Sequence, residues 1–251
     1  MEISKTIIQF EYKPVDYFET RFQDSNAKYT LNIENGIVEI NLFAPQDVVP
    51  KLLQKEITDK IHAILNARMV IKHEPFELGS INIQQHYPNG TINTHRTIAG
   101  VASVIKFKTY APDIVIKDAD RKIIRDTKAE RIAQEEIFMK LSADIVNKNP
   151  LVKKLFDSYK SAVIDPKNEL VYLYEIRDSL KGLYGSEKKA LKQLNFPKSK
   201  WNRLGSLSNV EPLMEGRHRG LNENLRHATD EELSEARKIV HELITAFLSK
   251  I

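Results

Sequence analysis

The sequence predicts an α+β fold, in which an N-terminal antiparallel β-rich half with one helix precedes an all-helical C-terminal half. Three observations predict it. Apolar and polar residues alternate on both sides of Asn35-Gly36, which is the pattern of a β-hairpin with a two-residue turn. Helix-start signals dominate after Asp126, and residues 229–248 carry apolar side chains at helical spacing. We therefore expect a β-rich domain over residues 1–126 and a helical domain over residues 127–251.

The first strand is expected around Ile8, Phe10 and Tyr12, which alternate with polar residues. The hairpin at Asn35-Gly36 suits a type I′ turn, because both central residues of that turn need a positive φ. Its predicted register pairs apolar residues on one face: Ile33 with Val38, Leu31 with Ile40, and Tyr29 with Leu42.

A second hairpin is predicted at Asn89-Gly90, between residues 81–87 and 91–98. Folding the chain at this dipeptide makes His86 and His95 diagonal neighbours on a polar face. We interpret that face as solvent-facing, with a binding platform for a nucleotide or base as the alternative.

The other elements of this half are one helix and several shorter strands. The helix is expected over residues 47–69, a further strand over 101–110, and a third hairpin between 114–116 and 122–124.

Capping signals mark the starts of the later helices. Asn149 and Asp165 each precede a proline, which is favoured at the first helical position. The helix that opens at Asp165 is expected to end near Gly182. Two segments have the spacing of a capping box, and two shorter helices are expected further along the chain. The boxes are Thr127 with Glu130 and Thr229 with Glu232, and the shorter helices start at Ser186 and Ser199.

The composition excludes several classes of function. The chain of 251 residues has no cysteine, which excludes disulfides, thiol catalysis and cysteine-ligated metal centres. Residues 1–13 lack the features of a signal peptide, and no apolar run approaches the roughly 20 residues that cross a bilayer. We therefore expect a cytoplasmic protein with no membrane partner.

Positive charge is concentrated in one part of the chain. Residues 177–227 contain eleven Lys and Arg against five Asp and Glu, although the whole chain has a net charge of only +4. A local basic excess is typical of a surface that binds a phosphate-bearing partner. A solvated lysine-rich surface is the alternative interpretation.

The segment Gly216-Arg217-His218-Arg219-Gly220, followed by Arg226 and His227, best suits a ligand site. Arginine offers forked donors to phosphate or carboxylate, and histidine can move protons near neutral pH. The alternative is that the arginines form structural ion pairs with Glu175, Glu211, Glu215 or Glu223. The predicted ligand-binding residues are Arg217, His218, Arg219, Arg226, Arg203, Lys200 and Lys189. The candidates for a catalytic role are His227, His218, Arg217 and Arg219.

We predict no metal site and no cofactor. Glu175 and Asp178 share a helix face, but two such carboxylates are more often solvated or paired with arginine than bound to a metal. The chain also lacks a glycine-rich phosphate loop, a dinucleotide-binding fingerprint, an HExxH motif and a GxSxG motif.

Three segments of the C-terminal half resemble an uncharacterised bacterial protein family. They are Leu-Tyr-Glu-Ile-Arg-Asp at 173–178, Trp-Asn-Arg-Leu-Gly at 201–205, and Gly-Arg-His-Arg-Gly at 216–220 with Leu225-Arg226.

More loosely, the helical half is similar to HEPN-type helical domains, which occur in bacterial toxins and phage-defence proteins and often cut RNA without a metal. Those nucleases carry an arginine, four to six further residues, and then a histidine. Here ten positions separate Arg217 from His227, whereas Arg68 and His73 fit the spacing but lie in the N-terminal half.

The leading functional hypothesis is a binding module for a phosphate-bearing ligand, either RNA or a nucleotide, in bacterial defence or stress response. The HEPN resemblance implies the alternative of a metal-independent ribonuclease. In that case His227 or His218 is the general acid or base, and Arg217 or Arg219 stabilises the phosphorane. A third hypothesis is a protein-interaction subunit or homo-oligomer whose basic surface meets an acidic partner.

Overall fold

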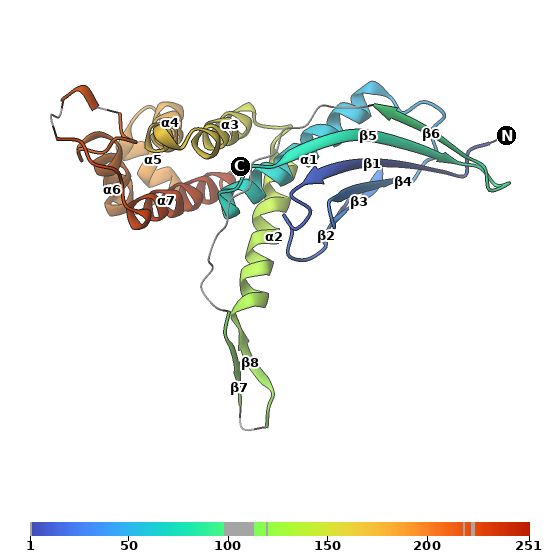
Figure 1. Ribbon diagram of the computed structural model, residues 1–251, viewed down its shortest axis with the longest axis horizontal. Helices are drawn as coiled ribbons and strands as arrows, with labels where there is room; N and C mark the ends of the chain where they lie inside the picture. Colours follow the sequence, from blue (N-terminus) through green and yellow to red (C-terminus); the bar gives the residue numbers. More distant parts are fainter. Residues whose placement is uncertain (1, 98–112, 119, 218, 222–223) are drawn as a thin grey trace. The chain divides into compact units, whose positions relative to one another are not determined.

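The fold is α+β, as predicted. The computed structural model describes residues 2–97, 113–118, 120–217, 219–221 and 224–251, and the chain divides into two compact units. The first unit contains residues 1–61 and 76–140, and the second contains residues 62–75 and 141–251. Strands dominate the first unit and helices the second (Figure 1). The boundary predicted near residue 126 separates two domains, residues 1–126 and 127–251. This division of the chain stays a prediction.

The first unit is built on a six-stranded antiparallel sheet with the order β2-β3-β4-β1-β5-β6. The hairpin at Asn35-Gly36 is confirmed: φ is 49° at Asn35 and 78° at Gly36, and the predicted register is observed. The strands are β1 (Lys5–Lys13), β2 (Phe22–Ser25), β3 (Tyr29–Glu34), β4 (Ile37–Leu42), β5 (Glu77–His86) and β6 (Ile92–Thr97).

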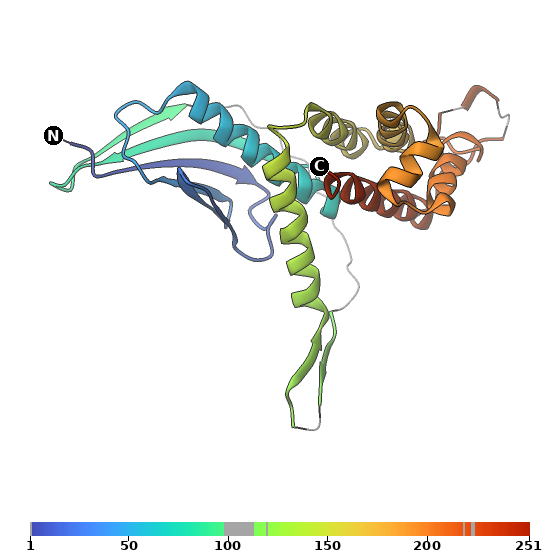
Figure 2. The same cartoon turned by 180° about the vertical axis from the view of Figure 1, so that it is seen from behind.

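Helix α1 (Lys51–Lys72) corresponds to the helix predicted over residues 47–69. Its first half belongs to the first unit, where Ile57 and Ile61 are completely buried. Figure 2 shows this half running alongside the sheet. The third predicted hairpin is also confirmed and leads into helix α2 (Thr127–Ile145). Its strands are β7 (Val115–Lys117) and β8 (Ile123–Asp126).

The register predicted for the second hairpin is wrong by one residue. Ile83 pairs with His95 and His86 pairs with Ile92, so the two histidines lie on opposite faces of the ladder and are not diagonal neighbours. Gly90 has a φ of 85°, whereas Asn89 does not have a positive φ. The loop is therefore the three-residue type with glycine at its last position, because Pro88 fixes a negative φ at the first.

Two other local predictions are corrected. Asp126 caps α2, since its Oδ1 accepts from the Ala129 backbone N–H at 3.0 Å, and Thr127 bonds Ile114 instead of closing a capping box. The helix expected to end near Gly182 continues to Tyr184, and Gly185 after it has the left-handed φ of 78° suited to a helix end. The strand predicted over residues 101–110 lies outside the described residues.

The second unit is helical, with α4 at its centre: α4 contacts α3, α5, α6 and α7. The capping residues predicted at Asn149, Ser186 and Thr229 are confirmed, and Thr229 with Glu232 forms a complete capping box. No helix within the described residues is long and apolar enough to span a membrane. The helices are α3 (Pro150–Ile164), η1 (Pro166–Asn168), α4 (Glu169–Tyr184), α5 (Glu187–Leu194), α6 (Lys198–Asn209), η2 (Arg219–Leu221) and α7 (Asp230–Leu248).

Candidate functional site

The loop between α6 and α7 carries the Arg/His segment, and backbone bonds close its base. The Met214 N–H donates to the Arg226 carbonyl and the Arg226 N–H to the Pro212 carbonyl, each at 2.9 Å. The Arg217 N–H donates to the Ser208 carbonyl of α6 at 2.8 Å. Gly216 favours this close approach, because a Cβ there would lie 3.2 Å from two backbone oxygens and the neighbouring backbone would have to shift.

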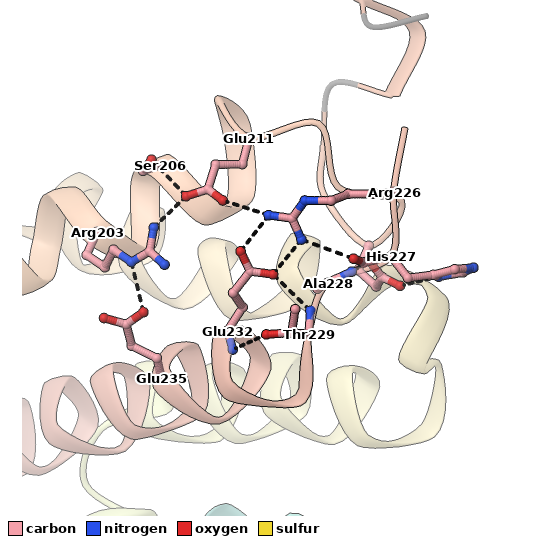
Figure 3. A network of polar contacts seen from close by, with 10 residues as sticks. Arg203, Ser206, Glu211, Arg226, His227, Ala228, Thr229, Glu232 and Glu235 are labelled. Atoms are coloured by element: carbon pink, nitrogen blue, oxygen red, sulfur yellow. Dashed lines mark hydrogen bonds and ion pairs between the residues drawn. The ribbon is translucent and has the colours of Figure 1, made fainter. Parts of the chain in front are cut away.

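Arg226 lies in an ion-pair network that ties the loop to α7 (Figure 3). Its two terminal nitrogens each lie 2.7 Å from a different carboxylate oxygen of Glu232, which is the bidentate geometry that arginine favours. Hydrogen bonding to Arg226 lowers the pKa of Glu232 to about 2. Arg226 also contacts Glu211 at 3.3 Å.

Arg203 of α6 completes the same network (Figure 3). It contacts Glu211 on one side and Glu235 at 2.8 Å on the other. Lys200, one turn earlier on α6, pairs with Glu242 of α7. Three of the residues predicted to bind a ligand, Arg203, Arg226 and Lys200, are therefore engaged with α7 or the loop. The structural ion pairing that the sequence left open for the loop arginines is present at Arg226, which contacts Glu211. Ligand binding by these three residues stays a prediction.

Arg219 also bonds within the unit. Its guanidinium donates to the Gly216 carbonyl at 2.9 Å, to the Lys167 carbonyl at 3.2 Å, and to the Asn168 side chain. These contacts fix the loop to the segment that precedes α4. His218, a predicted ligand-binding and catalytic residue, lies outside the described residues.

His227 is held by a buried carboxylate. Its Nδ1 lies 2.8 Å from Glu215 Oε1, and the other Glu215 oxygen accepts the Ala228 N–H at 2.9 Å. Burial alone would raise the pKa of Glu215, but the His227 ring and the backbone donors outweigh it and lower that pKa. The His227 side chain is 77% exposed. This geometry orients the ring while leaving it accessible to a ligand.

Arg217 lies at the outer end of a series of cation–π contacts that we call the arginine ladder: Trp201, Arg177, Tyr174 and Arg217. The Arg217 guanidinium carbon lies 4.6 Å from the centre of the Tyr174 ring. The Arg177 carbon lies 4.9 Å from the same ring and 4.9 Å from the Trp201 ring. Cation–π attraction at these distances is typically worth about 0.5–2 kcal/mol, depending on exposure.

The two arginines of the ladder differ in exposure. Arg177 is buried, and its Nε has no hydrogen-bond partner within the described residues. Gly205 makes room for it, since a Cβ there would lie 2.3 Å from Arg177 Nη1. Arg217 keeps 37% of its side-chain surface exposed and meets only Asp178, at 3.4 Å, as a charged partner among the described residues.

Exposed lysines lie on α4, whose Tyr174 and Asp178 contact Arg217, and on α5, which packs against α4. None of them forms an ion pair within the described part of the chain, and Glu187, the only acid in the sequence of α5, contacts Arg177 at 3.4 Å. The charge of these lysines is therefore not compensated by an ion pair among the described residues. The lysines are Lys181 at the end of α4, and Lys188, Lys189 and Lys192 on α5. We call them, together with Arg217, the basic face.

A buried polar cluster was missed by sequence reasoning. Arg237 of α7 donates two bonds of 2.6 and 2.7 Å to Glu169, the first residue of α4, which is 1% exposed. His73 lies 3.5 Å from the same carboxylate and 3.2 Å from the Tyr159 hydroxyl. Burial alone would raise the pKa of Glu169, but Arg237 and His73 outweigh it and lower that pKa.

Sequence reasoning also missed the ladder. The signal that was present is spacing: Tyr174, Arg177 and Asp178 lie within one turn of α4. Within the described residues, no group of three or more His, Cys, Asp or Glu side chains could hold a metal ion. Comparisons with protein-family models, curated proteins and solved structures find no match to this chain.

Proposed function

We propose that the helical unit binds a phosphate-bearing polymer, single-stranded RNA being the best fit, through the basic face. The observation that carries the proposal is the environment of the Arg217 side chain. Its guanidinium carbon lies 4.6 Å from the centre of the Tyr174 ring, and the side chain is partly exposed. Helices α4 and α5 carry four exposed lysines that form no ion pair within the described residues. Phosphate contacts by Lys and Arg supply most of the affinity of such complexes.

The ion pairs distinguish Arg217 from the other arginines. An exposed pair such as Arg217–Asp178 is worth about 0–1 kcal/mol, so a phosphate can displace the carboxylate at little cost. Arg226 is held in bidentate geometry by Glu232 and contacts a second carboxylate as well. In this proposal Arg217 and Lys189 contact the ligand, whereas Arg203, Arg226 and Lys200 hold the loop in place.

Replacing Arg217 with alanine is expected to weaken binding of a labelled single-stranded RNA about tenfold, the loss of one charge-assisted contact. The melting temperature should fall by no more than about 5 °C, because the side chain is partly exposed, its ion pair is weak and one cation–π contact is lost. Affinity is measured by fluorescence anisotropy at low salt.

The charge-matched control is Lys238→Ala, which removes an exposed lysine of α7. It should leave affinity within about twofold of the unmodified protein. Equal affinities for the Arg217→Ala and Lys238→Ala variants would show that Arg217 does not contact the RNA. Unfolding of Arg217→Ala would assign the residue a structural role.

A second function, metal-independent cleavage of RNA, is favoured by one observation. Glu215 accepts from His227 at Nδ1, which sets the tautomer in which Nε2 can act as a general base. The same carboxylate is itself fixed by the Ala228 N–H, so the ring has one preferred orientation.

If the protein cleaves RNA, incubation with end-labelled RNA in EDTA is expected to yield fragments, and His227→Ala should abolish them. Glu215→Gln should slow cleavage by about 10- to 100-fold or more, because it removes the charge that stabilises a protonated ring and leaves one acceptor oxygen for two N–H donors. Fragments that persist in the His227→Ala variant would show that His227 is not the general base.

A further inference from the structure

The arginine ladder bears on which ligand the basic face accepts, an inference that rests on the proposed function. Its inner layers are tightly fixed. Trp201 is completely buried, Arg177 is 8% exposed, and Gly205 leaves no space for a side chain beside the Arg177 guanidinium. Tyr174 and Arg177 lie one turn apart on α4, so the helix itself sets their spacing.

The Arg217 side chain is therefore already ordered before a ligand binds. Two contacts hold it even when a phosphate displaces the Asp178 carboxylate: the Tyr174 ring beside the guanidinium, and the backbone bond from its N–H to the Ser208 carbonyl. A side chain that is already ordered loses little conformational entropy when a ligand binds. A long flexible lysine at this position would lack that advantage.

The chemistry of a planar guanidinium points to an aromatic ligand group. Arginine stacks on flat π-systems and at the same time offers in-plane N–H donors to phosphate, which lysine cannot do. Unpaired bases of RNA are commonly recognised by stacking on aromatic rings or arginine planes. The bases of a duplex are covered by their neighbours and cannot reach such a plane.

We propose that Arg217 is the outermost layer of the ladder and accepts an unpaired nucleobase on its exposed side, while Lys181 and the α5 lysines contact the flanking phosphates. The ligand class is accordingly single-stranded nucleic acid. A base on Arg217 continues the alternation of rings and guanidinium groups that begins at Trp201.

The experiment compares three labelled ligands: a single-stranded RNA, a strand of equal phosphate number without bases, and a duplex. The unmodified protein should bind the base-containing single strand about tenfold more tightly than the other two at equal salt. The Arg217→Lys variant keeps the charge but lacks the planar group, so it should bind the single strand and the abasic strand within about twofold of each other. Emission from Trp201, the one tryptophan of the chain, checks that the ladder is intact in the variant.

Each outcome of this comparison either supports base stacking on Arg217 or overturns it. Equal affinity of the unmodified protein for the single strand and the abasic strand overturns base stacking but leaves phosphate binding standing. A preference for the single strand that survives in Arg217→Lys places the stacking elsewhere. Failure to bind any of the three ligands overturns the proposed function together with this inference.

Discussion

Replacing Glu169 with glutamine is expected to lower the unfolding free energy of the helical unit by about 2–3 kcal/mol. Glu169 is 1% exposed, and its carboxylate receives two hydrogen bonds from Arg237 and faces His73. Removing the carboxylate charge leaves a partly buried guanidinium without its counter-ion. Removal of one partner of a buried pair typically costs about 3–5 kcal/mol. The smaller loss of about 2–3 kcal/mol is expected for Glu169→Gln because 27% of the Arg237 side chain reaches solvent.

Urea unfolding followed by Trp201 emission measures this effect, because Trp201 reports on the unit that contains Glu169. The matched control is Glu175→Gln, which removes an exposed carboxylate from the same helix and should change stability by less than about 0.5 kcal/mol. Equal midpoints for the two variants would show that the buried pair contributes nothing to stability.

The same pair implies a dependence on pH. The pKa of Glu169 is below its ordinary value of 4.5 in the folded protein, so its contribution is complete above that pH and is lost as the pH falls further. Between about pH 5 and pH 3, stability should therefore fall less steeply in Glu169→Gln than in the unmodified protein.

Replacing Lys188, Lys189 and Lys192 of α5 with alanine is expected to weaken single-stranded RNA binding by about 100-fold at low salt. The slope of log affinity against log salt should become shallower by about 2, since each phosphate contact on a single strand contributes about 0.7. These side chains are exposed and form no ion pair within the described residues, so their removal should not unfold the unit.

A control with the same change in net charge replaces Lys153, Lys238 and Lys250, which are exposed on other parts of the helical unit. It should lower affinity only slightly and leave the salt slope unchanged. If both triple variants lose affinity equally, the attraction follows net charge and no particular face of the unit is responsible.

The two asparagine–glycine hairpins show what local sequence can and cannot predict. At Asn35-Gly36, turn chemistry and the alternation of apolar residues agree, and the register is as predicted. At Asn89-Gly90, the preceding Pro88 has a fixed φ and no N–H for the ladder. Pro88 therefore belongs to the loop, and this shifts the register by one residue. Attention to that proline would have given the right pairing.

The candidate site was only partly predictable because most of its contacts are tertiary. The capping box at Thr229 is local and was found, whereas the partner of Arg217 is Asp178, 39 residues away. Composition identified the Arg/His loop but could not show which of its arginines are paired. The ladder depends on the packing of α6 against α4, which no local pattern specifies.

The most direct test of the central claim, that the basic face binds phosphates, is the salt dependence of single-stranded RNA affinity for the unmodified protein. Three or four phosphate contacts predict a slope of about −2 to −3 for log affinity against log salt. A slope near zero, or no binding at low salt, would contradict the claim and direct the search to a protein partner.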